Sequence, residues 1–277
     1  MSHPLITVIC TAKNADRTIG PTLRSVQAQT LARWEMVVID DGSTDATAQL
    51  VREFSDADPR FRLVLTDGVG RARALNMGLE EAATPLVANI DADDLFDRDH
   101  LCTMLDLYEK QSEFMTICTT VHFISDEQSY SAPSPNHTAG PEQLKDITPQ
   151  LLVRNPVCHS SVIMDRLKVL EIGGYNEQIR SQFDWELWIR IAQHGYKIGE
   201  LPLPLVAKRI HENQSFEAGR RLKYVLYSLQ FQARAIRSLD GRWYHWIIMG
   251  CRLLWGLVPR RFAFWLREKR RVLKGGT

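Results

Sequence analysis

Three aspartates stand within four positions of the chain, at Asp91, Asp93 and Asp94. They follow the apolar run Pro85 to Ile90, which is typical of a buried strand with the acids at its carboxyl end. Because three like charges this close repel one another, a site that holds them usually also holds a cation. An Asp-x-Asp pair offers the oxygen ligands that Mg2+ or Mn2+ takes, with water and a substrate phosphate completing the shell. The alternative is a solvated acidic turn that caps the next helix.

Two further polar clusters follow predicted strands earlier in the chain. Thr11 to Asn14 comes after a β-branched run, and Asp40 to Asp45 comes after an apolar one. In parallel sheets, ligands bind beyond the carboxyl ends of the strands. The three clusters are therefore expected at one edge of one sheet, which favours a ligand site over three unrelated turns. For the middle cluster, the alternative is turn and helix-cap chemistry with Ser43 or Thr44 as the cap.

Strand and helix patterns alternate through about the first 100 residues. Apolar runs of strand length are followed by stretches whose apolar residues recur with helical spacing. This alternation predicts an α/β fold with a mostly parallel central sheet flanked by helices. The predicted strands are Leu5 to Cys10, Met36 to Ile39, Arg62 to Leu65 and Val87 to Ile90, and the predicted helices are Ile19 to Leu31, Ala46 to Phe54 and Arg71 to Ala82.

The glycine-rich motifs of other nucleotide-binding enzymes do not fit this chain. Gly68-x-Gly70 lacks the third glycine of a dinucleotide fingerprint and follows the third strand, which disfavours a Rossmann dehydrogenase. The sequence contains no Gly-x-x-x-x-Gly-Lys-Ser/Thr loop, which disfavours a P-loop enzyme. A nucleotidyltransferase, which also sets carboxylates and metal at strand ends, usually shows a glycine-rich basic loop near its N-terminus, and Thr11 to Asn14 is not such a loop.

Four segments, in this order and spacing, resemble the family 2 glycosyltransferases. They are Thr7 to Asn14, Val37 to Asp45, Ala74 to Gly78 and Asn89 to Asp94, and the resemblance extends to about residue 216. It implies the A-type fold of nucleotide-sugar transferases, with a Rossmann-like N-terminal half. The implied catalytic domain, 1–216, divides into a nucleotide-sugar-binding half, 1–100, and an acceptor-binding half, 101–216. Residues 217–277 then form a basic, aromatic-rich helical tail.

The resemblance also implies roles for single residues. In the family, the positions of Thr11 and Asp41 contact the nucleobase, that of Asp91 lies by the ribose, and that of Asp93 ligates the metal that bridges the diphosphate. Lys13 departs from the family, because many relatives carry an aromatic residue there that stacks on the base. The residues expected to bind the nucleotide sugar are Thr11, Ala12, Asn14, Asp41, Arg71, Asn76, Asp91 and Arg209. The metal, Mn2+ or Mg2+, is assigned to Asp93, Asp91 and His211.

Arg209 and His211 belong to a segment, Lys208 to Ser215, that looks like the family's Arg-x-His-x-x-x-x-Ser element, which closes over the diphosphate. Strand alternation points both side chains to the same side. A guanidinium group fits phosphate, and a neutral imidazole is a competent Mn2+ ligand. The alternative is that both residues merely lie on an edge strand.

The proton acceptor is expected at the start of a helix that contains Phe183 and Trp185. Asp184 stands there, and its structural alternative is a charge favoured by the helix dipole. The segment resembles the family's Glu-Asp motif, whose aspartate is the general base, although Phe183 replaces the glutamate. Asp184 is therefore assigned as the base. Asp94, His159 and Trp185 are assigned to the acceptor side. The alternative for Asp94 is a supporting role, and that for His159 is a structural one. The helical spacing of Trp185 and Trp188 also predicts that both are core residues.

The composition is that of an ordinary globular protein, with 44% hydrophobic and 24% charged residues among 277. The net charge of +1 hides an asymmetry, because residues 217–277 carry 14 Lys and Arg against 3 Asp and Glu. This tail predicts helices over Tyr224 to Ile236, Arg242 to Val258 and Arg260 to Arg267. Its Trp and Arg content favours in-plane contact with an anionic membrane. The alternative is a helical hairpin packed on the body or on the second subunit of a homodimer, and nothing beyond the charge favours nucleic acid.

The cysteines and the N-terminus favour a cytoplasmic setting. Cys10, Cys102, Cys118, Cys158 and Cys251 are dispersed without Cys-x-x-Cys spacing, which favours reduced thiols. The segment from Met1 to Thr11 lacks the pattern of a signal peptide. Together with the basic tail, these features predict a cytoplasmic protein at the inner face of the cell membrane.

Together, the residue patterns and the family resemblance predict an inverting, metal-dependent glycosyltransferase. It would move a sugar from a nucleoside diphosphate sugar to a hydroxyl of a saccharide or lipid-linked saccharide, in the synthesis of a surface polysaccharide or glycolipid. The family resemblance implies the inversion. The alternatives are a nucleotidyltransferase and a catalytically silent family member that acts as a membrane-associated scaffold, for which Phe183 is the indication.

Overall fold

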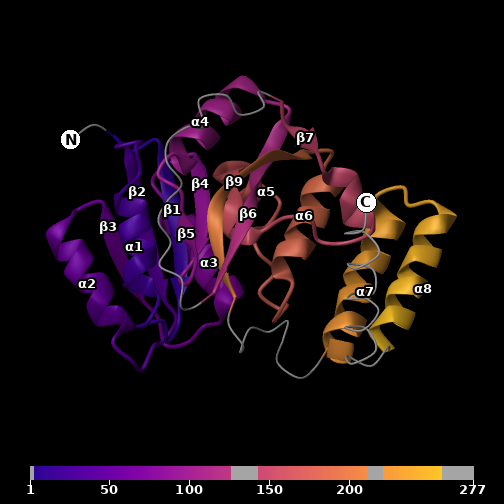
Figure 1. The fold of residues 1–277 in the computed structure, drawn as a ribbon, viewed down its shortest axis with the longest axis horizontal. Coiled ribbons are helices and arrows are strands. Elements are labelled where there is room, and N and C mark those ends of the chain that lie inside the picture. The colour runs from indigo at the N-terminus through magenta and orange to yellow at the C-terminus, as the bar shows by residue number, and fades with distance from the viewer. Residues whose placement is uncertain (1–2, 126–142, 211–220, 258–277) are drawn as a thin grey trace, which may run out of the picture. The chain divides into compact units, whose positions relative to one another are not determined.

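The computed structural model describes residues 3–125, 143–210 and 221–257 (Figure 1). The chain divides into two compact units. The first comprises Met1–Leu151 and Asn155–His211, and the second comprises Leu152–Arg154 and Glu212–Thr277. His211 and the helix predicted over Arg260 to Arg267 lie outside the described residues.

The described strands of the first unit form one sheet. They are β1 (Ile6–Ala12), β2 (Trp34–Asp40), β3 (Phe61–Leu65), β4 (Leu86–Asp91), β5 (Leu95–Phe96), β6 (Phe114–Ser125), β7 (Lys145–Asp146), β8 (Val162–Asp165) and β9 (Lys197–Ile210). The strand order is β3-β2-β1-β4-β8-β6-β9-β5, and β7 pairs with β9. The first four strands are parallel, as are β6 and β9, whereas the pairings of β5, β7 and β8 are antiparallel.

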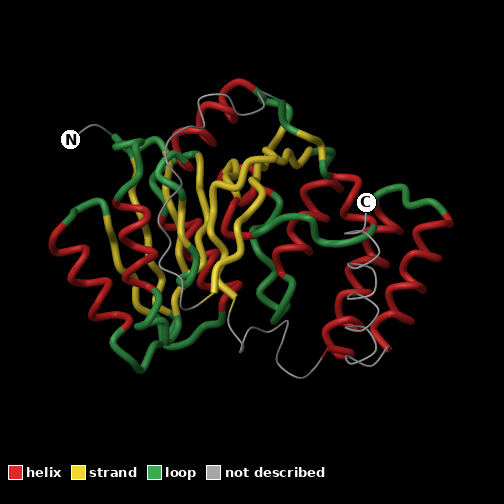
Figure 2. The backbone as a smooth tube through the Cα atoms, in the orientation of Figure 1, coloured by secondary structure: helices red, strands yellow, loops and turns green. Residues whose placement is uncertain are grey.

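Helices flank this sheet (Figure 2). They are α1 (Ile19–Gln27), α2 (Thr47–Ala57), α3 (Arg71–Glu81), α4 (His100–Lys110), α5 (Arg166–Glu171) and α6 (Phe183–Gln193), with short 3-10 helices at Thr148–Leu152 and His159–Ser161. The predicted α/β class with a mainly parallel sheet is confirmed, as are the three helices predicted in the N-terminal half. Leu31 is an exception, because α1 ends before it.

The parallel strands are covered on both faces because alternate residues point to opposite sides. On one face, Val8, Val38 and Ala88 join the core formed with apolar residues of α1, α2 and α4. On the other face, Val37 and Ile39 pack with Ala74 of α3. This two-sided burial explains why the strands read as continuous apolar runs in the sequence. It also aligns the carboxyl ends of β1, β2 and β4 at one edge of the sheet.

Asp45 supplies the side-chain oxygen at the start of α2, so the prediction of Ser43 or Thr44 as the cap is wrong. The Oδ1 atom of Asp45 accepts hydrogen bonds from the backbone N–H of Thr47 at 3.0 Å and from its hydroxyl at 2.5 Å. Ser43 and Thr44 face Asn14 instead. The N–H of Asn14 donates to Ser43 Oγ at 2.9 Å, and the N–H of Thr44 donates to Asn14 Oδ1 at 2.9 Å. These bonds join the ends of β1 and β2.

In the described part of the second unit, the chain forms the helices α7 (Arg221–Ser238) and α8 (Trp243–Leu257), as the sequence predicts. Arg252 is a charged residue within the mainly apolar sequence of α8, and its side chain reaches α7. Its guanidinium donates hydrogen bonds to Gln232 Oε1 and to the Val153 carbonyl, the latter at 2.6 Å. The charge in the middle of α8 therefore holds the helix pair together. Within the described ranges, neither these helices nor the others are long and apolar enough to cross a membrane.

His100, at the start of α4, is fully buried and is expected to make the protein less stable in acid. Its ring stacks on Phe96 at 4.2 Å, and in the described part of the chain neither ring nitrogen has a hydrogen-bond partner. Burial lowers the pKa of His100 from 6.5 to about 3. The unfolded chain therefore takes up a proton below about pH 6.5 that the folded protein excludes, and stability is lost as the pH falls.

Between pH 6.5 and 5, this protonation is expected to remove roughly 2 kcal/mol from the free energy of unfolding. Urea unfolding at a series of pH values measures the loss, and the variant His100→Phe should lack it. The exposed His194 provides the control, since His194→Phe should keep the pH dependence of the original chain. The same slope in His100→Phe and the original chain would contradict the assignment.

Candidate active site

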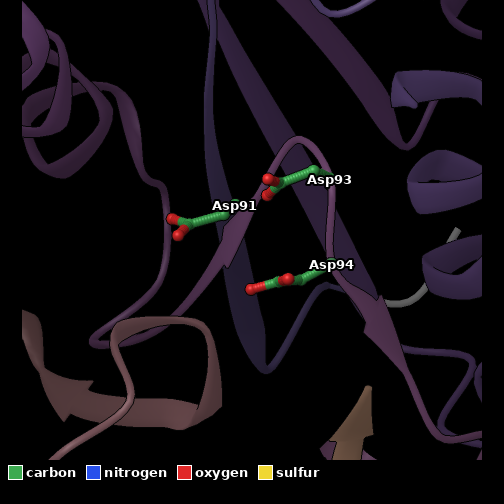
Figure 3. A group of neighbouring side chains, drawn as sticks. All are labelled: Asp91, Asp93 and Asp94. Carbon is green, nitrogen blue, oxygen red and sulfur yellow. The ribbon is translucent and has the colours of Figure 1, made fainter. Parts of the chain in front are cut away.

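The three aspartates lie in the turn that joins β4 to β5, which we call the acidic turn (Asp91–Asp94). The N–H of Asp94 donates to the Asp91 carbonyl at 3.1 Å and closes this turn. One carboxylate oxygen from each of Asp91, Asp93 and Asp94 lies within 4.8 Å of the other two (Figure 3). Thr11 is the register partner of Asp91 in the β1–β4 pair. The acids therefore stand at the carboxyl end of the parallel strands, where the sequence predicts a ligand site.

Asp91 is held in its charged form by the cations around it. Burial opposes the charge, but the groups around Asp91 together outweigh burial and hold the pKa of Asp91 well below its usual range; the strongest of them is the Arg71 guanidinium, which donates a hydrogen bond to Oδ1. His159 and Lys208 act in the same direction. The Nδ1 atom of His159 lies 3.6 Å from Asp91 Oδ1, and Lys208 Nζ lies 4.0 Å from Oδ2.

Asp94 is buried and links β9 to the acidic turn. Its Oδ2 accepts a hydrogen bond from the Ser160 hydroxyl, and its Oδ1 accepts one from the N–H of Arg209 at 2.9 Å. Burial first, and then the charge of Asp91, raise the pKa of Asp94 to about 7. The sequence predicts a supporting or an acceptor-side role for Asp94, and the bonds of both oxygens within the protein match the supporting one.

Arg209 also faces inward and is only 7% exposed. Its Nε donates to the carbonyl of Asp93 at 3.1 Å, and its Nη1 donates to the carbonyl of Ser125 at 3.4 Å. In this conformation Arg209 fixes the backbone of the acidic turn, whereas the sequence predicts a contact with the diphosphate. The neighbouring metal ligand predicted at His211 lies outside the described residues.

A second polar surface surrounds Asp41, at the ends of β1 and β2. Its carboxylate accepts hydrogen bonds from the N–H of Gly70 at 3.1 Å and from the Thr66 hydroxyl at 3.0 Å. Lys13 lies alongside, with Nζ 4.0 Å from Asp41 Oδ2 and more than half of its side chain exposed. These contacts set a negative and a positive group side by side where the resemblance implies the nucleobase.

Thr11, Ala12 and Asn14 border this surface. The Ala12 carbonyl accepts a hydrogen bond from the N–H of Asp41 at 2.8 Å, and the side chain of Ala12 is buried. Gly42 lets the adjoining loop approach, because a Cβ atom at this position would lie 2.9 Å from the backbone nitrogen of Gly68. The structure therefore brings the predicted base-contacting residues together at one edge of the sheet.

Asn76, predicted to bind the nucleotide sugar, holds a turn of the protein instead. Its Oδ1 accepts a hydrogen bond from the N–H of Tyr175 at 2.7 Å. Its Nδ2 donates to the Tyr175 carbonyl at 2.9 Å and to Glu177 Oε1 at 2.8 Å. A Cβ atom at Gly174 would lie 2.6 Å from Asn76 Oδ1, so glycine is required beside this amide. These three bonds use both N–H groups of the buried amide and one lone pair of its oxygen, so the amide holds the turn at Tyr175 to Glu177.

His159 belongs to a buried hydrogen-bond network with Tyr175 and Asn89. The Tyr175 hydroxyl lies 2.9 Å from His159 Nε2 and accepts a hydrogen bond from Asn89 Nδ2 at 2.8 Å. The other ring nitrogen of His159 faces Asp91. The sequence predicts either an acceptor contact or a structural role for His159, and this burial matches the structural one. The network orients the imidazole toward the carboxylate of Asp91.

Removing the Tyr175 hydroxyl is expected to destabilise the protein. Tyr175→Phe removes the hydroxyl from His159 Nε2 and Asn89 Nδ2 and leaves these two buried atoms only each other, 3.1 Å apart, so the free energy of unfolding should fall by ~1–3 kcal/mol. Urea unfolding measures the change. The partly exposed Tyr196 provides the control, and Tyr196→Phe should change the free energy by less than about 0.5 kcal/mol. Equal stability of Tyr175→Phe and the original chain would show that the network contributes nothing.

Asp184 lies at the start of α6, as predicted. Its Oδ2 accepts a hydrogen bond from Asn155 Nδ2 at 2.7 Å. Arg71 connects it to the acidic turn, because the charges of Asp91, first, and then of Asp184 and Asp93 raise the pKa of the Arg71 guanidinium. Arg71 also lies over the Phe183 ring, 5.5 Å from its centroid. The predicted proton acceptor and the predicted metal ligands Asp91 and Asp93 thus interact electrostatically with one arginine.

Trp185 is 1% exposed and belongs to the core of the first unit, together with Trp188. Its placement follows from the helical spacing of the aromatic residues in α6. The acceptor contact predicted for Trp185 does not fit this burial, because the side chain offers no surface to a ligand. It supports the start of α6, where Asp184 stands.

The site residues absent from the sequence prediction include Asn89, Ser160, Tyr175 and Lys208. A signal existed for Asn89, because a polar side chain within a buried apolar strand must find hydrogen-bond partners. The other three come from segments distant in sequence, and no local pattern brings them to the acidic turn. Lys208 adjoins the predicted Arg209 on β9, but its neighbours Asp91 and Asp94 become visible only in the fold.

The acidic turn fits a divalent ion. Two oxygen ligands of one Mg2+ lie at most about 4 Å apart, given bonds of about 2.1 Å. Three carboxylate oxygens within 4.8 Å of one another therefore need only small side-chain shifts to share an ion. Carboxylates are the ligands that Mg2+ and Mn2+ prefer. Of the three, Asp91 and Asp93 are partly exposed, and Asp94 is buried.

Known proteins share this sequence pattern and fold. A family model described as glycosyl transferase family 2 matches residues 7–168. An uncharacterized glycosyltransferase of Haemophilus influenzae is 27% identical over 219 residues, 76% of this chain and 67% of that protein. The putative teichuronic acid biosynthesis glycosyltransferase TuaG of Bacillus subtilis is 39% identical over 113 residues, 40% of this chain and 42% of that protein. The structure of the mannosyltransferase PcManGT from Pyrobaculum calidifontis, in complex with GDP-Man and Mn2+, matches with a TM-score of 0.66 at 21% identity, covering 98% of this chain and 81% of that chain.

Proposed function

Because the chain belongs to glycosyl transferase family 2, we propose that it is an inverting, metal-dependent glycosyltransferase that uses a nucleoside diphosphate sugar. The observation that carries this proposal is the position of Arg71. Its guanidinium is bonded to Asp91 and responds to the charge of Asp184. A cation between the acidic turn and the base is suited to a reaction in which negative charge moves from an acceptor oxygen to a diphosphate.

The donor binds along the carboxyl ends of the parallel strands. The nucleoside lies beside Thr11 and Asp41, and the ribose and diphosphate lie toward the acidic turn. The partly exposed Asp91 and Asp93 would hold Mn2+ or Mg2+, which would offset the charge that develops on the departing diphosphate. The complex of PcManGT with GDP-Man and Mn2+ supports a donor and an ion of these classes.

Asp184 takes the proton of the acceptor hydroxyl as its oxygen attacks the anomeric carbon. Asn155 donates to one carboxylate oxygen of Asp184 and fixes its orientation. The second oxygen is then directed at the acceptor. Attack on the face opposite the departing diphosphate inverts the anomeric centre, an outcome that the family membership supports.

The acceptor is a saccharide, or a lipid-linked saccharide, of a surface polysaccharide. The similarity to TuaG, a putative enzyme of teichuronic acid biosynthesis, supports this class. A binding screen tests the donor half of the proposal. Isothermal titration of nucleotide sugars in the presence of Mn2+ should give one donor that binds the original chain and not Asp41→Ala. If no nucleotide sugar binds, the proposal fails, and the result supports a catalytically silent family member that acts as a scaffold.

We propose that the second unit binds the surface of a membrane. Four residues of α8, namely Trp243, Ile247, Leu254 and Leu257, are each more than half exposed. Their spacings of four, seven and three residues put them on one face of the helix. Residues 217–277 also carry 14 basic against 3 acidic residues, which attracts anionic lipid. An apolar stripe in a basic segment suits binding in the plane of the bilayer surface.

Liposome flotation tests this location. The full chain is expected to float with vesicles that contain phosphatidylglycerol, and the triple variant Trp243→Ser, Ile247→Ser, Leu254→Ser is expected to remain in the dense fraction. The matched control replaces Leu65, Phe123 and Leu167, three exposed apolar residues of the first unit, with serine. Flotation of the α8 variant to the same extent as this control would contradict the membrane contact.

A further inference from the structure

Lys208 brings a positive charge into the acidic turn. Its Nζ lies 4.0 Å from Asp91 Oδ2, 3.8 Å from Asp94 Oδ2 and 3.8 Å from Cys158 Sγ. Burial lowers the pKa of Lys208, but Cys158 and the carboxylates of the acidic turn outweigh it and raise the pKa well above its usual value. The ammonium is therefore charged. Because 31% of the side chain is exposed, it also remains in reach of a ligand.

The ammonium and a divalent ion compete for the same oxygens. Arg71 occupies Oδ1 of Asp91, so Oδ2 is the oxygen that faces Lys208. In Asp94, Oδ1 accepts the N–H of Arg209, and Oδ2 faces both Ser160 and Lys208. An ion bound at the acidic turn would thus lie within a few ångströms of the ammonium, and two cations this close repel each other.

We propose that Lys208 is a built-in counter-ion of the acidic turn, which weakens the binding of a free divalent ion and moves to the donor's diphosphate when metal and donor bind together. The inference rests on the proposed function, since it assumes that ion and diphosphate meet here. Without donor, the ammonium neutralises the carboxylates. A diphosphate offers it a new anionic partner and releases those oxygens to the ion. Metal and donor therefore strengthen each other's binding.

Binding of Mn2+ alone tests this role, with free Mn2+ measured by electron paramagnetic resonance during titration. Without nucleotide, Lys208→Met is expected to bind Mn2+ about tenfold more tightly than the original chain, because the repelling charge is gone. Lys208→Arg keeps the charge and should stay within about twofold of the original chain. The matched control is Lys168→Met, whose Nζ lies 3.1 Å from Asp165, and it should leave the affinity unchanged.

Equal Mn2+ affinities for Lys208→Met and the original chain would overturn the role of Lys208 and leave the proposed function standing. Absence of Mn2+ binding in both chains would overturn the metal site as well as the counter-ion. Lys208→Gln provides a second neutral variant with a polar end beside Cys158, and it should reproduce the gain in affinity. Circular dichroism of each variant confirms that its fold is retained.

Discussion

Replacing Asp184 with asparagine is expected to lower the rate of sugar transfer about 10³-fold, because the amide cannot take the proton of the acceptor hydroxyl. The amide keeps the size of the carboxylate and can still accept the hydrogen bond from Asn155, so the start of α6 should keep its structure. Donor affinity should change by less than about twofold, since Asp184 acts on the acceptor. Rates at saturating donor and acceptor, together with donor titration, separate the two effects.

The control for this variant is Asp106→Asn, which alters an exposed aspartate of α4 paired with Lys110. It should retain the full rate. Transfer by Asp184→Asn at the rate of the original chain would mean that another group removes the proton. A loss of donor binding as large as the loss of rate would instead show that Asp184 belongs to the donor site.

Replacing Asp93 with alanine is expected to abolish metal-dependent transfer, with a loss of about 10³-fold, or ~4 kcal/mol of transition-state stabilisation. Asp93 is the member of the acidic turn to which the proposal assigns the metal, and it is partly exposed. Asp91 is bonded to Arg71, and Asp94 is bonded to Ser160 and Arg209. Alanine at position 93 should therefore remove an ion ligand while leaving those contacts in place.

Titration with Mn2+ and the transfer rate in saturating Mn2+ measure the effect of Asp93→Ala. The control is Asp56→Ala, at an exposed position of α2, and it should match the original chain in both measurements. If Asp93→Ala bound Mn2+ as tightly as the original chain, the ion would be held elsewhere and the acidic turn would be structural.

The parallel half of the sheet is predictable from the sequence for a local reason. The strands β1 to β4 are mainly apolar because helices cover both faces of the sheet, and each intervening helix shows apolar residues at helical spacing. The antiparallel insertion of β8 between β4 and β6 is not predictable in this way. The insertion depends on pairing between segments far apart in the chain, and no local sequence pattern predicts such a pairing. Yet this insertion carries Ser160 and His159, just before β8, up to the acidic turn.

The sequence identifies the chemistry of the site better than the direction of its side chains. Asn76, Asp94 and Arg209 are predicted as site residues, but their polar atoms hold other parts of the protein. A motif records residue types and spacing, whereas burial depends on packing against distant segments. For Lys208 the opposite holds: the sequence assigns it no role in the site, and its proposed role follows only from the distances to Asp91 and Asp94.

The release of nucleoside diphosphate from the donor found in the binding screen tests the central claim most directly. With an acceptor extract and Mn2+, the original chain is expected to release nucleoside diphosphate and form a glycosylated product. Release should stop in EDTA, and it should be about 10³-fold slower in both Asp93→Ala and Asp184→Asn. Release that proceeds in EDTA, or that is as fast in either variant as in the original chain, would contradict a reaction built on the acidic turn and Asp184.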